Sequence, residues 1–109
     1  MTYDERREVY TNALIRYGEP MQLIVGLEEL SECQKEICKF LRGLGNAGDL
    51  AEEVADAMIM LEQVQMIFGI EDMVNREVNR KVSRLDGKLK GIDPERTNRD
   101  DGGFGSTGR

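Results

Sequence analysis

The chain has 109 residues, with 15 Lys and Arg against 21 Asp and Glu, which gives a net charge of −6. A chain of this length forms one domain with a thin core, so self-association would help to stabilise it. Histidine is absent. Its absence excludes Ser-His-Asp and Cys-His hydrolases, His-ligated zinc and Glu-x-x-His di-iron sites. The acidic balance argues against a nucleic-acid partner, because polyanions bind to basic surfaces.

Four segments favour helix and are separated by glycine, in the order 4–17, 20–42, 50–68 and 71–90. Sustained period-2 alternation, the pattern typical of strands, is not found. We therefore predict an all-α fold of the four-helix-bundle type, with one domain over residues 1–91. The remaining segment, 92–109, has few apolar residues to bury and is predicted to be a disordered tail.

Local signals predict where these helices begin. Asp4 is a candidate N-cap for the first helix, and Pro20 fits the first turn of the second. The glycine-dense segment 43–48 is predicted to be a flexible loop. Asp49 then fits the N-cap of the third helix, with Glu52 as its capping-box partner.

The cysteines and the apolar segments indicate a compartment. Cys33 and Cys38 are five residues apart in a predicted helix, about 140° around its axis, which is a poor geometry for a disulfide. We expect two buried, reduced thiols. Residues 1–8 are charged, and no run reaches the roughly 18 apolar residues of a membrane span, so we expect a cytoplasmic protein without a membrane partner.

The third predicted helix is apolar around nearly its whole circumference, which predicts a buried helix. Glu53 lies within its inner stripe and Asp56 lies at the edge of that stripe. A buried carboxylate needs a partner or a metal ion. Alternatively, Glu53 occupies the first turn only because acids favour a helix N-terminus.

The second predicted helix carries acids with the same spacing. Glu29 and Glu32 are three residues apart, on a face that they share with Glu36 and that differs from the main apolar stripe. Two antiparallel helices joined by a short loop would bring both acid pairs together. Four converging carboxylates need a cation, and an all-oxygen site suits Mg²⁺ first and Mn²⁺ second. Such a site predicts metal-assisted attack of water on a phosphoryl group. The alternative is that both acid pairs are solvated helix faces.

The pattern Glu28-Glu29-x-x-Glu32, a gap of 20 residues and then Glu53-x-x-Asp56 resembles the signature of the MazG-like all-α nucleoside triphosphate pyrophosphatases. The resemblance covers about residues 20–90. It implies Mg²⁺-dependent hydrolysis of a nucleoside triphosphate to a monophosphate and pyrophosphate, often as a house-cleaning activity. It also implies a helical bundle completed by a homodimer or a dimer of dimers.

The resemblance implies site roles. Glu29, Glu32, Glu53 and Asp56 correspond to the metal ligands, and Glu28 to a supporting or water-orienting acid. Further candidates would contact the substrate phosphates: Lys39, Asn79, Lys81 and Arg84. A solvated basic face is the alternative for these. Many family members carry an aromatic residue shortly after the last acid, where this chain has the run 57–60, Ala-Met-Ile-Met, so the nucleotide preference stays open.

Two other classes of protein compete with the pyrophosphohydrolase. A non-enzymatic helical interaction module could keep the fold and use the acids only as solvated or structural groups. A carboxylate-bridged redox metal protein is the third, and the lack of histidine argues against it.

Overall fold

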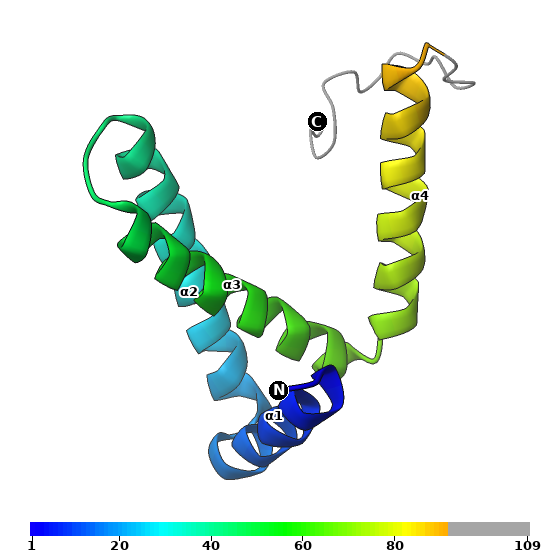
Figure 1. Ribbon diagram of the computed structural model, residues 1–109. Helices are drawn as coiled ribbons and strands as arrows, with labels where there is room; N and C mark the ends of the chain where they lie inside the picture. Colours follow the sequence, from blue (N-terminus) through cyan, green and yellow to red (C-terminus); the bar gives the residue numbers. More distant parts are fainter. Residues whose placement is uncertain (92–109) are drawn as a thin grey trace. The chain divides into compact units, whose positions relative to one another are not determined.

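The computed structural model describes residues 1–91 as four helices (Figure 1). They are α1 (Tyr3–Tyr17), α2 (Glu19–Leu41), α3 (Ala47–Phe68) and α4 (Glu71–Leu89). No strand occurs within residues 1–91, so the all-α prediction is confirmed for that part of the chain. The predicted tail, 92–109, lies outside the described residues.

The chain divides into two compact units, one formed by Met1–Gly69 and the other beginning at Ile70. The first unit contains α1, α2 and α3. The second contributes α4 to the described structure. The prediction of a single domain over residues 1–91 stays a prediction.

Pro20 lies in the first turn of α2 and α4 begins at Glu71, as predicted. The starts of α1 and α3 differ from the predicted ones because residues further upstream supply the caps. Thr2, not Asp4, caps α1: its hydroxyl accepts from the Glu5 backbone N–H, and the Glu5 carboxylate accepts from the Thr2 N–H. This reciprocal pair is a capping box, and it satisfies two N–H groups that the helix leaves unpaired.

The third helix begins three residues earlier than predicted. Asn46, not Asp49, is its N-cap, and the Asn46 side-chain oxygen accepts from the Asp49 N–H at 2.8 Å. The predicted pairing of Asp49 with Glu52 is therefore wrong. The loop between α2 and α3 is correspondingly shorter than the predicted 43–48, which favours close antiparallel packing of the two helices.

Helices α2 and α3 form an antiparallel hairpin, and they lie side by side in Figure 1. Gly26 is the buried residue of α2, and a Cβ built there would lie 3.4 Å from Met60 Cε and 3.6 Å from Met60 Cβ. Met60 of α3 therefore packs against the α2 backbone at Gly26, at a distance that would accommodate a methyl group. One turn before Gly26, the Gln22 amide donates to Gln63 Oε1 at 2.8 Å, which satisfies the oxygen of a side chain only 5% exposed.

Helix α1 is fastened to α3 by a polar cluster. Arg6 donates to both carboxylate oxygens of Glu62, at 3.0 Å each, and the Tyr10 hydroxyl donates to Glu62 Oε1. Removal of Tyr10 from water, together with its bond to Glu62, raises the pKa of Tyr10 to about 12. The bonds from Arg6 and Tyr10 lower the pKa of Glu62. The cluster therefore holds Glu62 as a carboxylate where two helices meet.

The core of the first unit is small. Its buried apolar residues are Tyr10, Ala57 and Met60. The prediction of a buried third helix is wrong for the single chain, because one side of α3 packs on α2 while Met58 and Phe68 are about 60% exposed. The main apolar stripe of α2 is also largely exposed, with Leu27 at 69% and Leu41 at 80%, while Leu23 and Leu30 are partly buried. The stripe consists of Leu23, Leu27, Leu30, Ile37, Cys38 and Leu41.

The cysteines are both free, as predicted, but the expected burial is wrong. Cys33 is partly buried and Cys38 is exposed. Cys38 lies on the part of α2 that α3 does not cover. Within residues 1–91, no helix is both long and apolar enough to span a lipid bilayer.

Candidate metal centre

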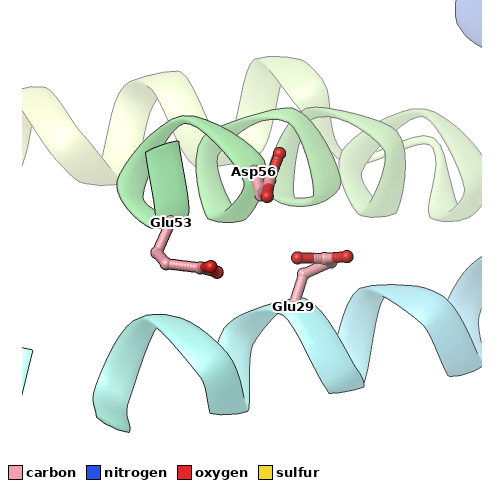
Figure 2. A group of neighbouring side chains, drawn as sticks. All are labelled: Glu29, Glu53 and Asp56. Carbon is pink, nitrogen blue, oxygen red and sulfur yellow. The ribbon is translucent and has the colours of Figure 1, made fainter. Parts of the chain in front are cut away.

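Three of the predicted metal ligands meet between α2 and α3. Glu29 projects from α2, while Glu53 and Asp56 project from α3 toward it (Figure 2). Each residue offers a carboxylate oxygen, and these oxygens all lie within 4.8 Å of one another. The i, i+3 spacing of Glu53 and Asp56 places both on the face of α3 that contacts α2.

This convergence depends on the contact at Gly26. Gly26 and Glu29 are three residues apart, so they share one face of α2, and Glu53, Ala57 and Met60 share the facing side of α3. The Gly26–Met60 approach therefore also sets the separation of the carboxylates. The contact between Gly26 and Met60, about one helical turn from Glu29 and Asp56, thus keeps the carboxylates of the two helices close together.

Proximity and partial burial disfavour the charged forms of Glu29 and Glu53. The pKa of Glu29 is raised by removal from water and then by the charges of Asp56 and Glu53. The pKa of Glu53 is raised by removal from water and then by the charges of Asp56 and Glu32. In the described part of the chain, none of the three converging acids forms an ion pair. A cation would relieve the repulsion among them.

One ligand oxygen is buried without any hydrogen-bond partner. Glu53 Oε1 is inaccessible to solvent, and no donor in the described structure reaches it. A buried carboxylate oxygen without a partner is costly, and a water, an ion or a ligand would satisfy it. The interpretation of Glu53 as a mere decoration of the helix N-terminus does not account for this burial.

Glu32 and Glu28 lie outside the group of three. The carboxylate of Glu32 is not among the oxygens within 4.8 Å, but its charge contributes to the raised pKa values of Glu29 and Glu53. Glu28 is exposed on α2, next to Glu29 in sequence and therefore about 100° away around the helix.

Glu36 is a neighbouring acid that was not among the predicted site residues. Its charge contributes to the raised pKa of Glu53, and its Oε2 is buried without a hydrogen-bond partner. Its other oxygen lies 3.6 Å from Lys39 Nζ. The signal was present in the sequence, because the spacing 29, 32, 36 follows one helix face.

The candidate phosphate-binding residues are divided between the two units. Lys39 lies on α2, ten residues after Glu29, and pairs with Glu36. Asn79, Lys81 and Arg84 lie on α4 in the second unit. The role of these four residues in binding a phosphate stays a prediction.

No family model, curated protein or solved structure matches this chain. The resemblance to the MazG-like group therefore rests on the sequence motif and stays a prediction.

Proposed function

We propose that the protein is a Mg²⁺-dependent nucleoside triphosphate pyrophosphohydrolase with a MazG-like fold, converting a (deoxy)nucleoside triphosphate and water to a monophosphate and pyrophosphate. The observation that carries the proposal is the convergence of Glu29, Glu53 and Asp56, with one buried oxygen that has no partner. The biological role that fits is sanitation or control of the nucleotide pool.

The donor set fits Mg²⁺, and Mn²⁺ as a substitute. All three ligands are carboxylates, and hard divalent cations prefer oxygen. Glu32 lies on the same face of α2 as Glu29 and completes the predicted set of four acids. When bound, Mg²⁺ would offset phosphate charge and lower the pKa of a coordinated water.

The chain's own residues have separate roles in this proposal. Glu29, Glu53 and Asp56 would hold the metal ion between α2 and α3, and Glu32 of α2 would be the fourth ligand. Glu28, exposed beside them, supports the site or orients the attacking water. In the first unit, Lys39 is the candidate for contacting the substrate phosphates and the charge that develops there. Asn79, Lys81 and Arg84 of α4 remain the candidates that the second unit offers for that role.

The exposed apolar surface supports a homodimer or a dimer of dimers. Residues of the main α2 stripe and of α3 remain open to water, including Leu27, Leu41, Met58 and Phe68. Monomeric proteins rarely expose so many large apolar side chains on adjacent helices. Pairing of two copies through α2 and α3 would complete a four-helix bundle in the cytoplasm.

A product assay tests the reaction. The full chain is incubated with Mg²⁺ and a panel of nucleoside and deoxynucleoside triphosphates, and the products are separated by chromatography. We expect monophosphate and pyrophosphate, and loss of both with EDTA. Diphosphate and orthophosphate would refute α–β cleavage.

A matched pair of variants tests the site. Glu53→Gln should abolish turnover and weaken Mg²⁺ binding measured by calorimetry, while the helical circular dichroism spectrum is retained. Glu52→Gln, an exposed neighbour on the same helix, should leave turnover and binding close to the wild type. Full activity of Glu53→Gln would refute the assignment of the metal site.

A second candidate function is a non-enzymatic helical interaction module. The exposed apolar stripe of α2 favours it, because an interaction surface alone explains that exposure. A module would show neither Mg²⁺ binding by calorimetry nor turnover at any Mg²⁺ concentration.

A further inference from the structure

Helix α4 carries apolar residues at the spacing of a coiled coil. Val78, Val82, Leu85 and Leu89 are separated by four, three and four residues. In heptad notation, Val82 and Leu89 occupy position a, and Val78 and Leu85 occupy position d. Counting back one heptad from Val82 places Asn75 at position a as well.

Most of this stripe is exposed to solvent. Val78 and Val82 are each 51% exposed and Leu89 is 78% exposed, while Leu85 is partly buried. Among the described residues of that unit, α4 is the one helix, so no other described helix of the unit covers the stripe. A helix in a protein owes most of its stability to the packing of its apolar face.

The residues beside the stripe favour one orientation of a partner helix. Lys81 occupies position g and Asp86 occupies position e of the following heptad. In a parallel pair of identical helices, position g of one copy faces the following e position of the other. Lys81 of each copy therefore lies opposite Asp86 of the other copy, which gives two equivalent pairs of opposite charge. An antiparallel pair would place g opposite g and e opposite e, which would bring like charges together.

Two further features fit a parallel pair. Val82 at a with Leu85 at d is the combination that favours two-stranded parallel coiled coils, while Val78 at d and Leu89 at a have the reverse arrangement. A single Asn at a specifies the register. Asp86 also accepts from Lys90 of its own helix at 2.9 Å, but both side chains are more than half exposed. Such an exposed pair contributes little and does not compete strongly with an inter-chain contact.

We propose that α4 pairs in parallel with α4 of a second copy of this chain, through a seam in which Asn75 meets Asn75. Two heptads alone associate weakly, so the pairing rests on the dimer proposed above, which holds the helices at high effective concentration. The symmetric seam is consistent with a two-fold dimer.

Disulfide cross-linking of the full chain tests the seam. In a Cys33→Ser, Cys38→Ser background, Asn75→Cys places a thiol at position a, where parallel helices bring identical residues together. Arg80→Cys places a thiol at position f, on the opposite face, and serves as the matched control. On mild oxidation we expect Asn75→Cys to become mostly disulfide-linked dimer, with doubled mass on a non-reducing gel, and Arg80→Cys to stay mostly single-chain.

Charge reversal tests the register. In the Asn75→Cys background, Lys81→Glu sets an acid opposite Asp86 of the second copy and should slow cross-linking about three- to tenfold, as expected for two exposed charge pairs. Adding Asp86→Lys should restore the rate. The readout does not involve turnover, so it is independent of any role of Lys81 toward phosphate.

The outcomes separate the coiled coil from the dimer on which it rests. A dimer by light scattering, without cross-linking of Asn75→Cys above the control, would overturn the α4 pairing and leave the dimer intact. A monomer at all concentrations would overturn both. Equal cross-linking of Asn75→Cys and Arg80→Cys would also refute the seam, because it would show random collision.

Discussion

Replacing Gly26 by alanine probes the contact that brings α2 and α3 together. Gly26 is buried in the interior of α2, and a Cβ there would lie 3.4 Å from Met60 Cε and 3.6 Å from Met60 Cβ. Both distances are ordinary van der Waals contacts. Met60 Cε is also the end of a flexible side chain, so it can move by a few tenths of an ångström.

The expected effect of Gly26→Ala is an increase in stability. Alanine is favoured over glycine in a helix interior by about 1 kcal/mol, mainly because the unfolded chain has less backbone freedom to lose. The new methyl group makes contacts without a severe clash, so we expect the free energy of unfolding to rise by about 1 kcal/mol. For a chain of this size, that corresponds to a rise in Tm of roughly 4–8 °C.

Thermal and urea unfolding followed by circular dichroism, at one fixed protein concentration, measure this effect. Gly69→Ala is the control, for which we expect the free energy of unfolding to fall instead of rise. Gly69 caps α3 with φ of 65° and has open space around it, so alanine there meets only backbone strain and should destabilise the protein by about 1 kcal/mol. A loss of more than 1 kcal/mol in Gly26→Ala would refute the reasoning, because it would mean that α2 and α3 approach more closely than described.

Three other predictions concern the caps, the polar cluster and pH. Asn46→Ala removes the cap of α3 and should cost about 1 kcal/mol in urea unfolding; an unchanged midpoint would contradict the cap. Tyr10→Phe keeps the ring but loses the bond to Glu62, and should cost about 1.5 kcal/mol, since Arg6 still holds the carboxylate; calorimetry at neutral pH tests it. Because folding lowers the pKa of Glu62 below its ordinary 4.5, its stabilisation is complete above that pH and is lost as pH falls through the lowered value. Glu62→Gln should therefore be less stable at neutral pH and lose less stability than the wild type between pH 5 and about 3; parallel acid unfolding curves would show that Glu62 does not contribute.

The helices were predictable because their signals are local. Gly18 and Gly69 end helices with positive φ, and the apolar residues in the segments between the glycines recur with the 3.6-residue period of a helix. The caps were less predictable, because neighbouring residues of similar chemistry compete. Asn46 and Asp49 both suit an N-cap, and the path of the loop decides between them.

The acid pairs were predictable in the same way, since i, i+3 spacing on a helix projects two side chains together. The antiparallel order of the helices followed from the short loop. The prediction of four converging acids could not be refined to Glu29, Glu53 and Asp56 without the crossing of α2 over α3. The position of Glu36 beside the site depends on the same crossing.

The sequence by itself determined the four helices and the candidate ligands, because backbone hydrogen bonds and periodicity act over a few residues. Only the tertiary structure decided which faces meet. Both α2 and α3 present apolar residues on more than one side, and periodicity does not rank those sides. The observed packing of Met60 on Gly26 places the acids inside the hairpin and leaves Leu27 and Leu41 exposed to water.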